Sequence, residues 1–356
     1  MRSSGASAPE GQEISVENRR RVNGYMAEKG ISIEYLADGE AVAMAAVEIS
    51  SVPDISIIDK NADESAVIDS YKKDMGNLLS EIYQNYKVQC SVAGQNKDLS
   101  LELLWTTEEV KNQPYRAKIR LFLIVRSIDM AKEAAAELTG SVLAACRSAL
   151  DLQKYEYAEV GAKELAGCIR NVEDTSIKAV VKEETVENLQ NQMIPMCYAY
   201  DRIPDTAQDL SRIVNALIDY PGCAVSFQLI PTWLDGNESN ELSRMMQMLD
   251  TLSKGVAEAG NISFALAEKH AEIYRYYADQ KNSALFLYNI LVYGGAEAVS
   301  NISSRVYAQL NAADQNVNMR FVDLYANEVQ KDTNFYPLPW AVNEMLMNAG
   351  RNPDIW

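Results

Sequence analysis

Along the chain, stretches in which hydrophobic and polar residues alternate are separated by stretches in which hydrophobic residues recur every three or four positions. The first pattern is typical of half-buried strands and the second of amphipathic helices. The strand pattern first becomes clear at "DISIIDK" (54–60). A helical stretch, 64–86, follows it, and its apolar residues at i, i+3, i+4 spacing are Val67, Ile68, Tyr71, Met75, Leu78, Leu79, Ile82 and Tyr83.

After this helix the strand pattern returns twice, at "LSLELLWT" (99–106) and at "AKIRLFLIVRS" (117–127). An Ala-rich stretch, 129–150, then has helical spacing, and Asp129 is placed to cap its first turn. A last strand, "KYEYAEV" (154–160), closes the series. The order strand–helix–strand–strand–helix–strand is that of the split βαβ, or ferredoxin-like, arrangement.

The same order of elements is predicted a second time in the C-terminal half. The stretch "QMIPMCYAY" (192–200) indicates a first strand. A helix over 205–220 follows, with Asp205 as its N-cap and Pro221 as its end. The remaining elements are two middle strands, a helix and a last strand, at 223–232, 283–293, 295–312 and 317–324.

Two strings at matching places in the two series are nearly the same: "SLELLWT" (100–106) and "SFQLIPT" (226–232). Short apolar strands resemble each other by chance, so the repeated order of six elements is the better indication of a duplication. We therefore predict an α+β protein of two ferredoxin-like units in tandem, the second with a helical-hairpin insertion, meeting near residues 165–190.

The predicted parts of the chain follow from this order. They are a tail with lead-in elements (1–50), the first unit (51–165), an acidic linker (166–190), the second unit (191–330) and a C-terminal connector (331–356). Within the lead-in part, we expect a short helix in 17–30 and a strand in 42–50.

The second unit differs from the first by an insertion at about 236–282, between its two middle strands. It holds two stretches with helical spacing, 240–260 and 263–282, and each has an apolar stripe. The first unit lacks this insertion, so the fold does not need it, and we expect it to contact a partner. The candidate interaction residues are Met245, Met248, Tyr274 and Tyr277. Excising the insertion is expected to leave a folded protein that no longer associates.

Composition and charge limit what such a protein binds. The chain has 356 residues, and its formal net charge is −17. An acidic surface repels phosphate backbones and anionic lipid headgroups, so we expect no direct nucleic-acid binding by this segment. No stretch of about 18 apolar residues and no apolar leader is present, so we expect no membrane insertion and a cytoplasmic location.

The sequence contains no motif that would place a catalytic, cofactor-binding or metal-binding group. A phosphate-binding loop needs a Gly-Lys pair, and the chain has none. The single histidine, His270, lies in a helical pattern, and the five cysteines form no C-x-x-C pair, which favours reduced thiols over a metal site. We therefore predict no catalytic residue, no cofactor and no metal, and we expect the purified chain neither to bind nor to hydrolyse ATP.

The hairpin "ELLWTT…AKIRLFLIVRS", the strand "YPGCAVSFQLIPT", the inserted helices and the tail "TNFYPLPWAVNEMLMNAGRNPDIW" together resemble the region before the motor of HerA/FtsK-like and conjugative type IV secretion ATPases. The resemblance covers roughly residues 50–356 and rests on strand patterns. It implies a region that precedes a nucleotide-binding core, whose phosphate-binding loop and later aspartate are absent here. The chain would then be a piece of such an ATPase or a stand-alone relative.

Three functions stay open on the sequence alone. The first is a non-catalytic module that positions an ATPase motor or binds another protein partner. The second is an enzyme with a pocket between the two units, using carboxylates such as Glu102 or Asp235. The third is a structural protein that builds homo-oligomers from its sheet edges.

Overall fold

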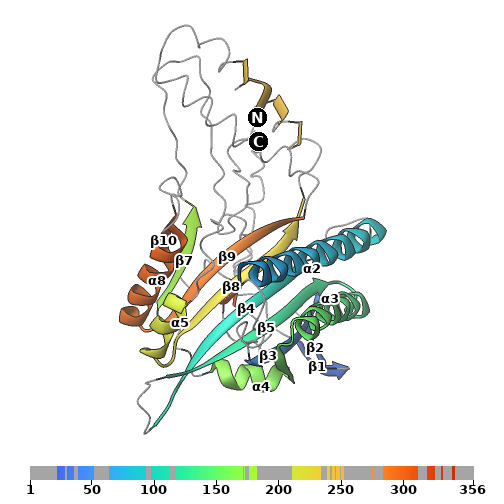
Figure 1. Cartoon of the computed structure of the whole chain (residues 1–356). Helices are drawn as coiled ribbons and strands as arrows, with labels where there is room; N and C mark the ends of the chain where they lie inside the picture. Colours follow the sequence, from blue (N-terminus) through green and yellow to red (C-terminus); the bar gives the residue numbers. More distant parts are fainter. Residues whose placement is uncertain are drawn as a thin grey trace, which may run out of the picture.

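The structure is a computed structural model, and it describes the chain in separate ranges. These are residues 22–28, 30–35, 39–51, 64–93, 98–111, 117–170, 172, 176–182, 211–233, 239–240, 243–244, 246–248, 250–251, 275, 284–311, 319–324, 330–331 and 339–340. Figure 1 shows a large sheet with helices packed against it. The protein is therefore a mixed α and β protein, as its sequence pattern predicts.

Twelve strands and five helices of eight or more residues can be followed in the described ranges. The strands are β1 (Val22–Glu28), β2 (Ile31–Tyr35), β3 (Ala41–Ser51), β4 (Asp98–Glu109), β5 (Ala117–Asp129), β6 (Glu156–Val160), β7 (Ser176–Lys182), β8 (Ala224–Thr232), β9 (Leu285–Gly294), β10 (Met319–Leu324), β11 (Gln330–Lys331) and β12 (Pro339–Trp340). The helices are α2 (Glu64–Ala93), α3 (Lys132–Leu152), α4 (Ala162–Ile169), α5 (Ser211–Ile218) and α8 (Ala296–Asn311).

Ten of these strands form one sheet in the order β1-β2-β3-β5-β4-β8-β9-β7-β10, with β6 paired to β3. The pairs within it are antiparallel. The N-terminal half contributes β6-β3-β5-β4 to this order, and the C-terminal half contributes β10-β7-β9-β8. Numbered along each half, both runs read fourth, first, third and second strand. The two halves are therefore arranged alike within one sheet.

The two halves meet where β4 pairs with β8, and we call this pair of strands the seam. The seam joins the two similar strings of the sequence, because Leu101 lies opposite Leu229 and Thr106 lies opposite Ala224. Glu102 lies opposite Gln228, which holds the same place in its own string. A local twofold relation between the halves therefore passes through this one residue pair.

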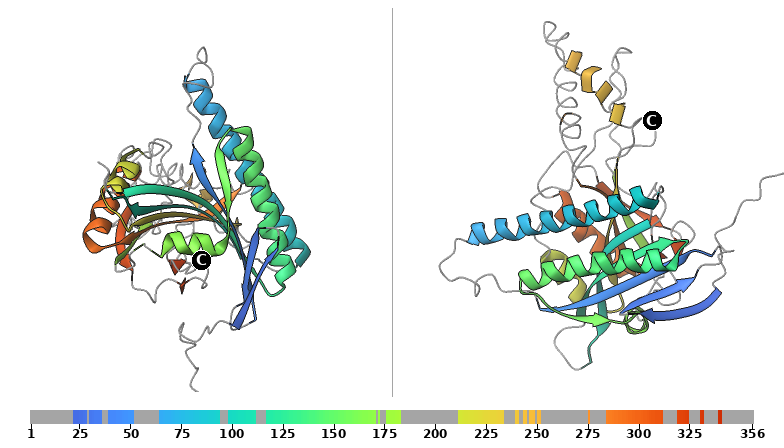
Figure 2. Two further views of the ribbon diagram at one scale, coloured as in Figure 1. Left: turned by 90° about the horizontal axis from the view of Figure 1, so that it is seen from below. Right: turned by 90° about the vertical axis from the view of Figure 1, so that its right-hand side faces the viewer.

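The helices cover the sheet unequally. On one face, α2 and α3 pack over the first half, with Ile82 and Leu138 in one buried cluster with Val125. On the same face, α5 and α8 pack over the second half, with Leu217 and Val299 in their cluster. The short helix α4 lies on the opposite face (Figure 2). We call these the four-helix face and the α4 face.

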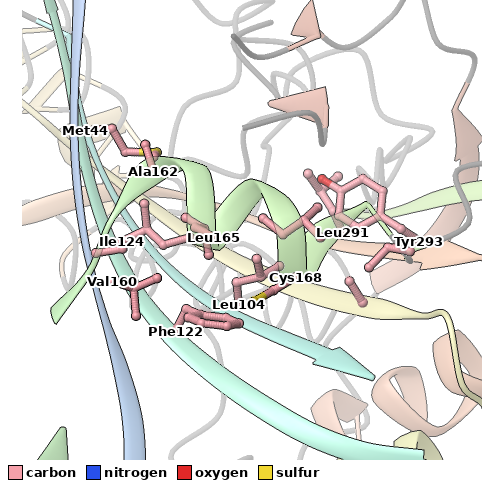
Figure 3. Close-up of a cluster of buried hydrophobic side chains, with 14 of the residues drawn as sticks. Met44, Leu104, Phe122, Ile124, Val160, Ala162, Leu165, Cys168, Leu291 and Tyr293 are labelled. Carbon is pink, nitrogen blue, oxygen red and sulfur yellow. The ribbon is translucent and has the colours of Figure 1, made fainter. Parts of the chain in front are cut away.

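The α4 face also carries a buried apolar cluster (Figure 3). Leu165 of α4 points into a buried cluster with Phe122 and Ile124 of β5 and with Leu291 and Tyr293 of β9. This cluster draws on strands from both sides of the seam. Burial of its apolar surface therefore stabilises each half and also the contact between them.

The lead-in region forms strands where it is described, and the predicted short helix at 17–30 is wrong for residues 22–28. Val22–Glu28 is β1, and it pairs with β2 in a hairpin whose turn contains Gly30 at a φ of 80°. Such a backbone conformation suits glycine, which has no Cβ to collide with the following carbonyl. The strand expected in 42–50 is present, because β3 spans Ala41–Ser51.

The first strand of each half lies earlier in the sequence than predicted. In the first half this place in the sheet belongs to β3, and "DISIIDK" (54–60) lies outside the described residues. In the second half it belongs to β7, which lies within the predicted acidic linker, and 192–200 lies outside the described residues. The linker prediction is thus wrong for 176–182, and β3 also runs across the predicted boundary at 50–51.

The other predicted elements of the two series are present where the structure describes them. The long strand of each half pairs with the strand before it, β5 with β4 and β9 with β8, as expected. Asp129 is not the cap that was predicted for α3, because the N-cap is Ala131 and has no side-chain cap hydrogen bond. The Oδ1 atom of Asp129 instead accepts a hydrogen bond of 2.9 Å from the Ala131 amide, before the helix begins. Asp205, the predicted cap of α5, lies outside the described residues.

Candidate functional site

A strip of polar side chains crosses the seam on the α4 face of the sheet. It is almost fully shielded from solvent, although its members are polar or charged. The strip consists of Ser100, Glu102, Arg126, Ser226, Gln228 and Asn289, which come from β4, β5, β8 and β9. Buried polar groups need hydrogen-bond partners, so this polar strip is the part of the fold with the most distinctive chemistry.

The centre of the polar strip is an ion pair between neighbouring strands. Arg126 Nη2 lies 2.7 Å from Glu102 Oε2, and the two side chains are 0% and 1% exposed. The hydroxyl of Ser226 donates a hydrogen bond to the other carboxylate oxygen of Glu102. Glu102 therefore connects β5, within its own half, to β8 of the other half.

These contacts give the carboxylate of Glu102 a structural role. Its carboxylate is held by a guanidinium in the same buried layer, and a charge-assisted hydrogen bond of this kind is stronger than a neutral one. Removing one member of a buried ion pair leaves an uncompensated charge and costs about 3–5 kcal/mol. The Glu102–Arg126–Ser226 contacts therefore fix how the two halves pair.

The polar strip is not symmetric across the seam, although the strands are. Ser100 lies opposite Arg126, whereas Ser226, its equivalent, lies opposite Leu291. The place equivalent to Glu102 is held by Gln228, whose amide has no hydrogen-bond partner among the described residues. The first half thus supplies both charges of the ion pair, and the second half supplies neutral groups.

A second polar group attaches α4 to the sheet. Arg120 of β5 donates to Glu48 of β3 through Nε and Nη2, at 2.7 and 2.5 Å. Its Nη1 lies 3.3 Å from Glu108 and also contacts the sulfur of Cys168 in α4. The hydrogen bond from Arg120 lowers the pKa of Glu48, against the opposing effect of burial. The guanidinium of Arg120 therefore finds its partners within the fold.

A third set of contacts joins the halves at the other end of the seam. Thr107 Oγ1 donates to the Tyr220 carbonyl at 2.7 Å and accepts from the Cys223 amide at 2.8 Å. The Gly222 amide also donates to the Thr107 carbonyl at 3.1 Å. The turn that leads into β8 is therefore held by the end of β4.

Helix α2 reaches across the seam to the base of the insertion. The ring of Tyr83 lies 6.1 Å from that of Phe286, and the ring of Tyr86 lies 5.9 Å from that of Trp233. Trp233 and Phe286 stand on either side of the inserted segment, at the end of β8 and the start of β9. A helix of the first half thus packs against both ends of the insertion in the second half.

The predicted interaction residues fall on the insertion, which is described only in part. Met248 is half-buried, and Met245, Tyr274 and Tyr277 lie outside the described residues. Arg275 Nη2 pairs with Asp250 Oδ1 at 2.6 Å. This ion pair links the two stretches that were predicted to form the hairpin. Asp235 and His270 also lie outside the described residues.

The structure brings together residues that the sequence did not single out. Arg126 and Arg120 were read only as part of the strand "AKIRLFLIVRS", yet each of them organises a polar group. The one available signal was an arginine at an inward position of an apolar strand, because a buried charge needs a partner. Glu102 was considered as an acid for catalysis, and its place in the ion pair was not predicted.

The described residues contain neither a candidate metal site nor a candidate membrane-spanning helix. No group of three or more metal-ligating side chains is found in these ranges. No helix within them is long and apolar enough to span a membrane.

Comparisons of the sequence with protein-family models and with curated proteins identify no family. No protein-family model matches the sequence, and no curated protein matches it. The resemblance to the region before the motor of HerA/FtsK-like ATPases therefore stays a prediction from the sequence.

Proposed function

We propose that this protein is a non-catalytic assembly module made of two ferredoxin-like units fused edge to edge. In this proposal it positions the motor of a HerA/FtsK-like ATPase, as a segment of one or as a stand-alone relative, or binds another protein partner. The strand order fourth, first, third, second in each half supports the ferredoxin-like assignment.

The observation that carries the proposal is that the carboxylate of Glu102 is bound within the fold. Among the carboxylates considered for catalysis, this one is described, and its two oxygens are engaged by Arg126 and Ser226 in a layer shielded from solvent. A general acid or base must reach its substrate within hydrogen-bond distance. Glu102 instead holds the two halves together, which is a task of an assembly module.

The edge strands of the sheet and the insertion offer such a module surfaces for binding partners. In the described ranges, β1 and β10 stand at the two ends of the strand order and each pairs with one strand. The described pieces of 239–251 lie away from the sheet in Figure 1. The insertion is therefore the part of the second half that we assign to the protein partner or motor.

The proposal is tested by calorimetric titration of the purified chain with ATP and Mg²⁺, together with light scattering over a range of protein concentrations. We expect no ATP binding at micromolar concentrations, because no Gly-Lys loop is present to compensate the charge of the triphosphate. We also expect the average mass to rise with concentration. Tight ATP binding, or a monomer throughout, would contradict the proposal.

A further inference from the structure

Helix α2 is only partly supported by the rest of the protein. It has 30 residues, which makes it about 45 Å long. In its second half, Ile82, Tyr83, Tyr86 and Cys90 are buried. In its first half, five consecutive residues from Lys73 to Asn77 are all exposed. Five residues make more than one full turn, so no side of the helix is covered there.

The figures show the same change along the helix. Both views in Figure 2 show the beginning of α2 extending past α3 and away from the sheet. A helical segment of this length is only marginally stable in water without packing contacts. The first half of α2 therefore lacks the support that its second half receives.

The apolar residues of α2 continue into this uncovered part at the spacing of a coiled coil. Apolar residues stand three and four positions apart in turn, which is the spacing of positions a and d in a heptad. They are Ile68, Tyr71, Met75, Leu78 and Ile82. Along this row Ile82 is buried, Leu78 is half-buried and Met75 is 42% exposed. We call this row the α2 stripe.

We propose that the α2 stripe pairs with the α2 stripe of a second copy of this chain. The inference rests on the proposed role as an assembly module and specifies one of its contacts. A row of alternating three- and four-residue spacing matches another helix of the same spacing, and two identical stripes satisfy a twofold contact.

Charge favours this contact over others between two acidic chains. The whole chain carries a net charge of −17, so most pairs of surfaces repel each other. Between Ala66 and Asn77, however, Asp69 and Asp74 are balanced by Lys72 and Lys73. Over this stretch α2 carries no net charge, so two copies can approach there without net repulsion.

The shape of the molecule favours an antiparallel pair. The sheet lies at the C-terminal end of α2, so antiparallel helices hold the two sheets at opposite ends of the contact (Figure 2). A parallel pair would bring both sheets to the same end. A twofold axis midway between Tyr71 and Met75 sets Met75 of one copy level with Tyr71 of the other and Ile68 level with Leu78.

The test compares two variants of the full chain by sedimentation equilibrium. Met75→Glu puts a charge into the α2 stripe, and Asn77→Glu puts the same charge on the exposed helix two residues away. We expect Met75→Glu to weaken dimerisation about tenfold or more, because the added carboxylate is buried without a partner. Asn77→Glu and Met75→Leu should dimerise like the native chain, and thermal melts should show all three folded.

The results separate this inference from the function on which it rests. A native chain that is monomeric at every concentration overturns both. A native chain that associates equally well with either glutamate substitution overturns the α2 stripe alone. Oxidation of a mixture of Met75→Cys and Tyr71→Cys chains tests the direction. A disulfide between the two variants supports the antiparallel pair, and Met75→Cys linking only to itself overturns that direction.

Discussion

At the scale of single residues, charged side chains decide how the sheet holds together. Arg126 and Arg120 lie on the same strand and face, and each neutralises a carboxylate from a neighbouring strand. The first of these pairs is shielded from solvent, whereas Arg120 and Glu48 remain partly exposed. The two pairs should therefore differ in how much stability a substitution removes.

Loss of Arg126 should be among the most damaging single substitutions in the sheet. Arg126→Met leaves the buried carboxylate of Glu102 without its counter-charge, and we expect the free energy of unfolding to fall by about 3–5 kcal/mol. Ser226→Ala removes a neutral donor and should cost about 1–2 kcal/mol. Urea denaturation followed by circular dichroism measures both. A smaller loss for Arg126→Met than for Ser226→Ala would contradict the role of the ion pair.

The Glu48–Arg120 pair should appear as a pH-dependent part of stability. Hydrogen bonding to Arg120 lowers the pKa of Glu48 from its ordinary value of 4.5. The stabilisation is thus complete above the unfolded-state value of 4.5 and is lost as the pH falls through the lower folded-state pKa. We expect Glu48→Gln to cost about 1 kcal/mol at neutral pH and almost nothing in strong acid.

Urea titrations of both proteins from neutral to acidic pH measure this difference. Glu137→Gln, which removes the same charge from an exposed position of α3, is the matched control and should change the stability at neutral pH much less than Glu48→Gln. A constant gap between Glu48→Gln and the native protein at all pH values would rule out the proposed contribution of Glu48.

At the scale of elements, the sequence predicted the middle of each half better than its beginning. Strands β4, β5, β8 and β9 were found because each is a long apolar run bounded by turn residues. β3 lacks that contrast, since seven residues from Ala41 to Val47 are all buried. α3 covers one of its faces and α4 the other, so polar residues do not alternate with apolar ones.

The acidic residues on either side of β7 prevented its prediction as a strand from the sequence. "SIKAVVK" (176–182) stands among glutamates, and the sequence pattern predicts a linker there. It pairs with β9 on one side and with β10 on the other, and these contacts with distant segments make it a strand. The seam was likewise not predictable, because nothing local in either string shows that β4 and β8 pair with each other.

The insertion can be tested as an element of its own. Replacing residues 236–282 by a short Gly/Ser turn should leave the sheet folded, because a longer or shorter loop at a hairpin tip changes closure entropy little. We expect cooperative thermal unfolding to persist, while binding to a protein partner or motor is lost. The sequence-based expectation that all association is lost is thereby narrowed, because pairing through the α2 stripe, which lies outside the deleted segment, should remain.

Calorimetry of the shortened protein and a binding measurement with an isolated HerA/FtsK-like motor domain check this expectation. Trp233 and Phe286 are kept in the deletion, so that the contacts with Tyr86 and Tyr83 of α2 are preserved. Aggregation or a much lower melting temperature would mean that the insertion belongs to the core of the second half. Unchanged partner binding would remove it from the interaction surface.

At the scale of the whole molecule, two similar halves share one sheet. The polar strip and the apolar cluster around Leu165 both draw residues from each side of the seam. Separate opening of one half would expose the Glu102–Arg126 pair and part of that cluster, which is costly. The two halves should therefore behave as one rigid support on which the insertion and α2 present their contacts.

Native mass spectrometry of the purified chain is the decisive experiment for an assembly module, because one spectrum reports both the oligomeric state and any bound molecule. We expect a dimer with twice the mass of the 39.6 kDa chain and with no added mass from a nucleotide or cofactor. A species of 39.6 kDa alone at all concentrations, or one carrying a bound nucleotide, would contradict a non-catalytic assembly module.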